Sequence, residues 1–210
     1  MKALVIGATG ATGKDLVKQL VENDAFETVS LFVRRPLEYN NPKIEVHVVD
    51  FDHVEDWKNL LSGDVLFSCM GTTRKQAGSK KAQWIVDYDY QYNVAKAAKE
   101  TGVNNYALVS STGAKADSSF FYMQMKGKLE EDVKSLGFRR TVIVRPPSLI
   151  RKESDRWAER ASVKILQCIN KIGLFTSMAP VDTDLVAKAL IKHSLEGDDG
   201  LKVVMPEDLI

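Results

Sequence analysis

The sequence has few of the residues that mark disulfide-rich or metal-binding proteins. Its 210 residues include two cysteines, Cys69 and Cys168, and three histidines, His47, His53 and His193. These residues lie far apart and match neither a disulfide framework nor a set of metal ligands. We therefore expect no structural disulfide and no bound metal.

An excess of one charge and long apolar runs are also missing. Lys and Arg together number 29 against 28 Asp and Glu, so net charge favours neither nucleic acid nor an anionic membrane surface. No apolar run is long enough to cross a bilayer, and a strand expected from residue 2 does not fit a signal peptide. These observations predict a cytoplasmic protein with no nucleic-acid partner and no membrane partner.

Three glycines stand between a predicted strand and a predicted helix at the start of the chain. Residues 2–6 form an apolar run, and residues 14–22 place apolar side chains on one helical face. A glycine turn between such elements binds the pyrophosphate of a dinucleotide, because backbone can approach closely and the helix N-terminus offers free N–H groups. The predicted cofactor contacts are Gly7, Thr9, Gly10, Ala11, Thr12 and Gly13.

Predicted strands and helices alternate along the rest of the chain. Further strands are expected at 28–33, 44–49, 64–69, 106–109, 140–145 and 201–205, and helices at 54–61, 84–100, 120–136, 155–171 and 182–193. This alternation predicts an α/β fold: one doubly wound parallel sheet of Rossmann type, with about seven strands and helices on both faces. We interpret residues 1–210 as a single domain in which residues 148–180 form a small segment that covers the substrate.

Two arginines follow the second predicted strand, where dinucleotide-binding folds select their cofactor. An acidic residue there binds the adenosine ribose and favours NAD, whereas arginine accommodates a 2′-phosphate. Arg34 and Arg35 therefore favour NADP(H) over NAD, the alternative being a solvated basic turn. Asp50 follows the third strand, where it could either meet the adenine amino group or cap a helix.

A tyrosine and a lysine four residues apart are the candidate reacting groups. Tyr122 and Lys126 share one face of the helix predicted after the fifth strand. A tyrosine pKa is near ~10, and a nearby ammonium stabilises the phenolate, which suits general acid–base chemistry. The same spacing occurs at Tyr39 with Lys43 and at Tyr92 with Lys96. We favour Tyr122 because its helix begins just behind the hydroxyl-rich turn after the fifth strand, at the ligand-binding edge of the sheet.

Several motifs resemble the short-chain dehydrogenase/reductase superfamily in its extended or atypical branch. They are the glycine turn at 7–13, the Ser110-Ser111 turn and the pair Tyr122 with Lys126. More closely, residues 69–74, 110–114, 118–127 and 144–146 resemble the Tat-interacting-protein family of oxidoreductase-like proteins. The resemblance implies a Rossmann-type domain, NADP(H) binding and a tyrosine that gives or takes a proton.

The resemblance also implies roles for individual residues. Tyr122 would be the acid or base, and Lys126 would tune it and bind the cofactor ribose. Arg34 and Arg35 would bind the 2′-phosphate. The superfamily serine at the end of the fifth strand could be Ser110, Ser111 or Thr112, with Ser111 slightly favoured over Thr112 and Ser110 near the cofactor. Met70 and Gly71 would line the cofactor, and Leu149 and Arg156 would approach it from the substrate side.

Two functions remain open at this point, and the arginine pair at Arg34 and Arg35 disfavours a third, an epimerase that uses tightly held NAD. The first is an NADP(H)-dependent oxidoreductase that transfers hydride between nicotinamide and a small carbonyl or alcohol, with Tyr122 transferring the proton. The second is a catalytically weak NADPH-binding protein that regulates a partner. A protein partner or a homodimer is compatible with either function, and the sequence does not identify a substrate.

Overall fold

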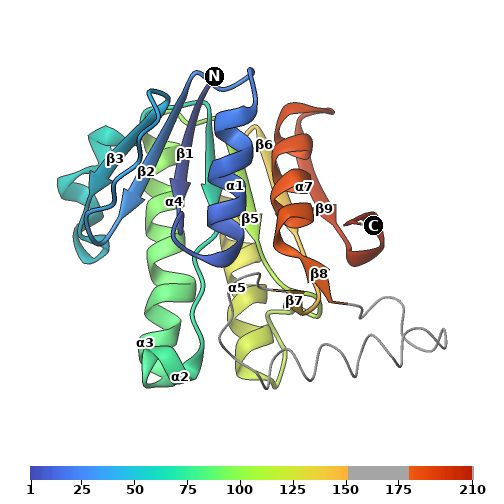
Figure 1. Cartoon of the computed structure of the whole chain (residues 1–210). Helices are drawn as coiled ribbons and strands as arrows, with labels where there is room; N and C mark the ends of the chain where they lie inside the picture. Colours follow the sequence, from blue (N-terminus) through green and yellow to red (C-terminus); the bar gives the residue numbers. More distant parts are fainter. Residues whose placement is uncertain (151–179, 210) are drawn as a thin grey trace.

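The structure is a computed structural model that describes residues 1–150 and 180–209. Its centre is a sheet of seven parallel strands in the order β3-β2-β1-β4-β5-β6-β9 (Figure 1). The strands are β1 (Lys2–Ile6), β2 (Thr28–Val33), β3 (Ile44–Val48), β4 (Val65–Ser68), β5 (Asn105–Val109), β6 (Arg140–Val144) and β9 (Gly200–Val204). Each strand begins and ends within one residue of its predicted bounds. The doubly wound parallel sheet is confirmed.

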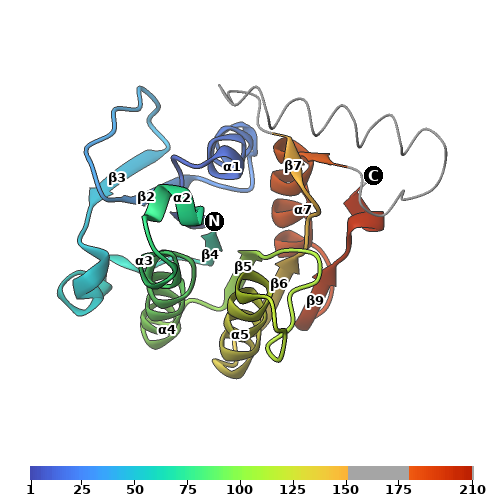
Figure 2. The same cartoon turned by 90° about the horizontal axis from the view of Figure 1, so that it is seen from below.

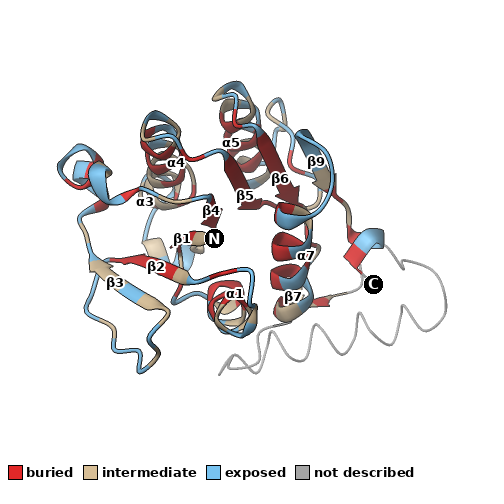
Figure 3. Cartoon of the chain, turned by 90° about the horizontal axis from the view of Figure 1, so that it is seen from above, coloured by how far each residue is buried: buried red, intermediate tan, exposed pale blue. Residues whose placement is uncertain are grey.

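Helices cover both faces of the sheet, as Figures 1 and 2 show. Helices α1 (Ala11–Glu22) and α7 (Thr183–Leu195) lie on one face, and α4 (Tyr90–Glu100) and α5 (Phe121–Ser135) lie on the other. Successive strand residues point to opposite faces, so Ala3 and Val5 belong to the α1/α7 core while Leu4 and Ile6 belong to the α4/α5 core. With both faces covered, the inner strands are continuous apolar runs. Figure 3 shows their burial and the more exposed edge strand β3.

The connection between β3 and β4 differs from the prediction. The α-helix expected at 54–61 is instead two 3₁₀ helices, η1 (Phe51–Asp56) and η2 (Lys58–Leu60). His53 interrupts the first helix with a φ of −126° and a ψ of 58°. Asp50 caps it, because its side chain accepts the Asp52 N–H at 3.0 Å. Because the non-helical His53 follows the cap at Asp50 so closely, the segment forms short 3₁₀ turns and no longer α-helix.

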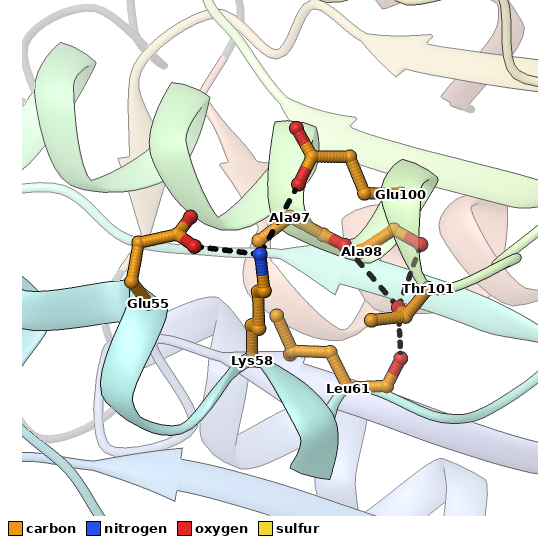
Figure 4. Close-up of polar contacts among 7 residues, drawn as sticks. All are labelled: Glu55, Lys58, Leu61, Ala97, Ala98, Glu100 and Thr101. Carbon is orange, nitrogen blue, oxygen red and sulfur yellow. Dashed lines mark hydrogen bonds and ion pairs between the residues drawn. The ribbon is translucent and has the colours of Figure 1, made fainter.

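Polar contacts attach this connection to the end of α4 (Figure 4). Lys58 Nζ lies 2.6 Å from Glu55 and 3.7 Å from Glu100. The Thr101 hydroxyl donates to the Leu61 carbonyl at 2.5 Å and also contacts the last carbonyls of α4. The irregular segment is thereby held against a regular helix.

The segment before α4 is more helical than predicted. Residues 74–83, where no helix is predicted, contain α2 (Arg74–Ala77) and most of α3 (Lys80–Trp84). Thr73 and Ser79 cap these short helices by accepting N–H groups from Gln76 and Ala82. Between α3 and α4 lies a π-helical turn, η3 (Ile85–Asp89). This widened turn determines which side chains face inward just before α4.

The remaining elements lie toward the end of the chain. Short strands β7 (Leu149–Ile150) and β8 (Val181–Asp182) pair in parallel, and η5 (Pro206–Leu209) follows β9. Among the described residues no side chain caps α5 or α7: Ser118 accepts the N–H of Phe120, and Asp182 stands at the N-cap of α7 without a capping bond. The helix predicted at 155–171 lies outside the described residues, as does most of the predicted covering segment 148–180. Among the described helices, none has the length and apolar character needed to cross a membrane.

Candidate nucleotide-binding site

The glycine turn after β1 is built so tightly that two of its glycines cannot carry a side chain. Gly7 has a φ of +81°, and a Cβ placed there would lie 2.5 Å from the backbone of Cys69. A Cβ on Gly13 would lie 2.0 Å from the carbonyl oxygen of Gly7. Gly10 stands at the N-cap of α1, and no side chain of the described residues caps this helix. Within the described part of the chain, the N-terminus of α1 therefore has no side-chain cap, as an anion-binding helix terminus requires.

A cleft opens at the carboxyl ends of β1, β2 and β4, the edge of the sheet that Figure 2 faces. It brings together six of the predicted cofactor residues from three separate segments. Arg34 is exposed and lies in the same cleft as the glycine turn, whereas Arg35 is exposed outside it. Ala11, Thr12 and Gly13 form the first turn of α1 behind the cleft. The lining residues are Gly7, Ala8, Thr9, Gly10, Phe32, Val33, Arg34, Phe51, Cys69, Met70, Gly71 and Val86.

The residues of this cleft fit the phosphates of a dinucleotide. An uncapped helix N-terminus and a guanidinium are both groups that bind phosphate, one through N–H groups and partial charge, the other through paired N–H donors. Gly10 and Gly71 are exposed in the cleft and have no side chain, so a ligand can approach their backbone closely.

Asp50 lies near this edge but its carboxylate already has partners. One oxygen accepts the Asp52 N–H, and the other lies 2.9 Å from Nδ1 of His53. The bond to His53 lowers the pKa of Asp50, and the same bond raises the pKa of His53. The helix-capping interpretation of Asp50 is confirmed. A contact between Asp50 and the adenine base stays a prediction, and Asp50 is not among the residues that line the cleft.

The three hydroxyls after β5 have different partners. Ser110 is buried and donates to the Glu130 carboxylate at 2.5 Å. Thr112 donates to the carbonyl of Arg145 at 2.9 Å. Ser111 is half-buried, and among the described residues its hydroxyl makes a single 3.4 Å contact, with the neighbouring carbonyl of Thr112. The Ser111 hydroxyl is therefore the freest of the three to meet a ligand.

Tyr122 and Lys126 occupy very different surroundings on α5. Tyr122 lies in the first turn and is 37% exposed, whereas Lys126 is 2% exposed. The ammonium of Lys126 lies 3.7 Å from the carboxylate of Asp87, a residue of the π-helical turn. The other oxygen of Asp87 accepts the N–H of Thr72 at 2.9 Å, directly after the cleft residue Gly71. The lysine of α5 is thus connected to the loop that lines the cleft.

The sequence reasoning missed Asp87. A signal was present, because Asp87, Gln91, Val94 and Ala98 recur at helical spacing and all four are buried. A carboxylate on the buried face of a helix requires a partner. Burial raises the pKa of Asp87, and the nearby Lys126 charge opposes this rise.

The remaining predicted residues lie farther along the chain. Leu149 belongs to β7 and is half-buried against the α1/α7 core. Arg156 lies outside the described residues. A cofactor contact from either residue stays a prediction.

The sheet order and the glycine turn after β1 define a Rossmann-type dinucleotide-binding protein. Residues 7–194 match the NAD(P)H-binding family, and the chain belongs to this family. Curated relatives include "Protein FMP52, mitochondrial" of Candida albicans, 35% identical over 207 residues that cover 95% of this chain and 90% of the relative. "Protein FMP52-1, mitochondrial" of Scheffersomyces stipitis is 38% identical over 203 residues, covering 93% and 89%.

Solved structures support the same fold at lower sequence identity. A UDP-glucose 4-epimerase of Thermotoga maritima, solved with UDP-glucose, superposes with a TM-score of 0.73 at 15% identity and covers 98% of this chain and 77% of its own. MoeE5 in complex with UDP-glucose and NAD gives a TM-score of 0.73 at 17% identity, with coverage of 100% and 80%. At such identities the likeness establishes the fold alone.

The prediction of a purely cytoplasmic protein is wrong by these comparisons. The relatives from Candida albicans, Meyerozyma guilliermondii and Debaryomyces hansenii are all named as mitochondrial proteins. The prediction rested on balanced charge and short apolar runs. Charge and apolar runs describe how a chain interacts with water and bilayers, whereas receptors recognise the signals that direct a protein to its compartment.

Proposed function

We propose that the protein is an NADP(H)-dependent oxidoreductase that transfers hydride between nicotinamide and a small carbonyl or alcohol. The observation that carries this proposal is the connection from the cleft to α5 through Thr72, Asp87 and Lys126. These contacts join the lysine of the Tyr122 helix to the loop that follows Gly71, which supports the proposal. A dinucleotide cleft and a tyrosine–lysine pair at one sheet edge supply both binding and proton transfer.

Binding rests on the residues that line the cleft. The N–H groups at the start of α1 hold the pyrophosphate, and Met70 and Gly71 lie along the cofactor. Arg34 binds the 2′-phosphate with its paired N–H donors, and Arg35 adds a second positive charge. The proposed preference for NADP(H) rests on these arginines, since the MoeE5 neighbour was solved with NAD.

Proton transfer rests on residues of α5 and of the turn after β5. NADPH, when bound, supplies the hydride. Tyr122 donates a proton to the substrate oxygen in the direction of reduction and accepts it in the reverse direction. Lys126 stabilises the phenolate of Tyr122 and holds ribose hydroxyls. Ser111 donates a hydrogen bond to the substrate oxygen and thereby polarises the carbonyl, with Thr112 as the second candidate.

The cofactor assignment is tested by reversing the charge of the cleft arginine. Arg34→Glu should weaken binding of NADPH and leave NADH binding equal or tighter, because a carboxylate repels the 2′-phosphate and accepts from ribose hydroxyls. Titration calorimetry with both nucleotides measures the two affinities. An unchanged preference for NADPH contradicts the assignment. Arg74→Glu is a matched control, since Arg74 is exposed on α2 and is not a cleft residue.

The catalytic assignment is tested with a panel of small aldehydes and ketones. NADPH oxidation by any panel member should fall by orders of magnitude in Tyr122→Phe, with NADPH affinity retained. Phe121→Tyr provides a control, because it places a phenol next to the proposed position without changing Tyr122. Turnover that survives in Tyr122→Phe contradicts the role of Tyr122.

A second candidate function is a catalytically weak protein that binds NADPH and regulates a partner. Two observations favour it: Tyr122 is outside the residues lining the cleft, and the charge of Lys126 is already paired with Asp87. Tight NADPH binding with no turnover of any carbonyl, together with a partner affinity that depends on NADPH, would support this function over the first.

A further inference from the structure

A buried ionic contact joins two helices beneath the cleft. The Lys126 and Asp87 side chains are 3% and 1% exposed, and their charged atoms lie 3.7 Å apart. One oxygen of Asp87, Oδ1, has no hydrogen-bond partner among the described residues. This oxygen is the one that faces the ammonium. Two opposite charges held this close in the interior interact far more strongly than at the surface.

The π-helical turn is the element that brings Asp87 to this position. In this turn the N–H of Tyr90 bonds to the carbonyl of Ile85, five residues back. The carbonyl of Asp87 is taken by the side-chain amide of Gln91 at 2.7 Å. Gln91 in turn accepts the Ser68 hydroxyl of β4 at 2.8 Å. The backbone of Asp87 is therefore fixed to the sheet, and its carboxylate has a set direction.

The carboxylate makes two contacts of different kinds. Oxygen Oδ2 accepts the N–H of Thr72, a neutral bond that orders the loop of the cleft. Oxygen Oδ1 faces Lys126, a contact that depends on charge. The buried thiol of Cys69 lies at the end of β4 and also experiences the Lys126 charge, but burial raises its pKa to about 12, so it stays neutral. Of these groups, the Asp87 carboxylate is the one that lies opposite the Lys126 ammonium.

We propose that Asp87 is a positioning residue that holds the Lys126 ammonium beside the nicotinamide half of the bound cofactor. This inference rests on the proposed function, because it takes Lys126 as a ligand of the ribose hydroxyls. Asp87 acts through Lys126 and does not itself touch the cofactor. Its contact with Thr72 fixes the distance between that lysine and the loop at Met70 and Gly71.

Two ligands separate this role from a merely structural one. NADPH has both halves of the dinucleotide, whereas 2′,5′-ADP contains only the adenosine half with its phosphates. Asp87→Asn keeps an oxygen that can accept the Thr72 N–H but loses the charge that holds Lys126. NADPH affinity should fall about tenfold, the effect of one charge-assisted hydrogen bond, while 2′,5′-ADP affinity stays unchanged. Asp89→Asn is the matched control, from the same turn but partly exposed, and should change neither affinity.

A double-mutant cycle tests whether Asp87 acts through the lysine. Lys126→Met should weaken NADPH binding, and adding Asp87→Asn to it should weaken binding no further. If Asp87→Asn alone fails to fold because it leaves a buried charge unpaired, the double variant removes both charges and restores folding. Thermal unfolding of each variant reports this directly.

The outcomes distinguish failure of this inference from failure of the proposed function. If the wild-type protein binds 2′,5′-ADP as tightly as NADPH, or binds neither ligand, Lys126 does not bind the ribose. That result overturns both this inference and the proposed function. Wild-type protein that prefers NADPH, with Asp87→Asn indistinguishable from it, overturns only the role of Asp87. Equal weakening of both ligands, or an Asp87→Asn effect that persists in the Lys126→Met background, also overturns that role.

Discussion

At the scale of single residues, Gly13 has the strictest requirement in the cleft. A methyl group there would meet the Gly7 carbonyl oxygen at 2.0 Å, so α1 would have to move away from the turn. We expect Gly13→Ala to lower the free energy of unfolding by about 2–3 kcal/mol, as overpacking does, and to weaken nucleotide binding. Urea unfolding and calorimetry measure the two effects.

Gly71→Ala serves as the comparison for Gly13→Ala. Among the described residues, its added Cβ would meet the Asp87 carboxylate alone, at the ordinary contact distance of 3.5 Å. The stability of Gly71→Ala should therefore stay close to that of the wild type. A Gly13→Ala variant that is as stable as Gly71→Ala would contradict the tight packing of the turn.

The pair His53 and Asp50 makes a prediction about pH. Bonding to Asp50 raises the pKa of His53 above 6.5, and bonding to His53 lowers the pKa of Asp50 below 3.8. The stabilisation from His53 is present below its unfolded pKa and lost as pH rises through the raised value. The stabilisation from Asp50 is lost as the pH falls through the lowered pKa of this carboxylate. The contact thus stabilises η1 between these two limits.

The measurement is an NMR titration of the histidine rings. The midpoint of His53 should lie above 6.5 and return toward it in Asp50→Asn. His193 is an internal control, because burial and the charges of Lys202 and Lys192 lower its pKa. Its midpoint should lie below 6.5 and stay unchanged in Asp50→Asn. A His53 midpoint that ignores the substitution contradicts the contact.

At the scale of elements, one carboxylate joins α5 to the ends of β5 and β6. Glu130 is buried on α5, where it accepts the Ser110 hydroxyl and two guanidinium bonds from Arg145 at 2.9 and 2.6 Å. We expect Glu130→Gln to cost about 3 kcal/mol of stability, because the Arg145 charge loses its buried partner. Chemical denaturation measures this cost.

Glu131→Gln is the control for that element, since Glu131 is the exposed neighbour of Glu130 on the same helix. It should leave the unfolding midpoint nearly unchanged. Equal midpoints for the two variants would show that the contacts of Glu130 do not stabilise the junction of α5 with the sheet.

The regular elements could be predicted from the sequence, whereas the irregular ones could not. Apolar runs such as residues 2–6 and 28–33 have few alternatives to a buried parallel strand. The 3₁₀ helices after β3 depend on the particular cap at Asp50 and the backbone of His53. The π-helical turn departs from the 3.6-residue period of an α-helix. A prediction based on that period therefore assigns 85–89 to ordinary α-helix.

The same distinction applies to the site. Gly7, Gly10 and Arg34 could be predicted, because the cleft lies directly after the strands that precede them. Partners distant in sequence could not be predicted from local patterns. The Ser110 hydroxyl binds Glu130, twenty residues later, and Lys126 meets Asp87 across two helices. Such pairs depend on how the helices pack against the sheet.

At the scale of the whole molecule, the nucleotide cleft is assembled from distant parts of the chain. Gly7 packs on the backbone of Cys69 because β1 pairs with β4. The whole of α1, β2 and β3 lies between these two strands in the sequence. The cleft therefore exists only after this long-range pairing has formed. Contacts of such sequence separation are acquired slowly during folding.

This order of assembly has a kinetic consequence. NADPH at a hundred times its Kd should stabilise the folded protein by about 2.7 kcal/mol, since the unfolded chain has no site for it. Because the cleft is completed late, that energy should appear as an unfolding rate about a hundredfold slower, with the refolding rate unchanged. Stopped-flow refolding and unfolding in urea, with and without NADPH, measure both rates. Bound nucleotide would then prolong the lifetime of the folded protein without shortening the time it needs to fold.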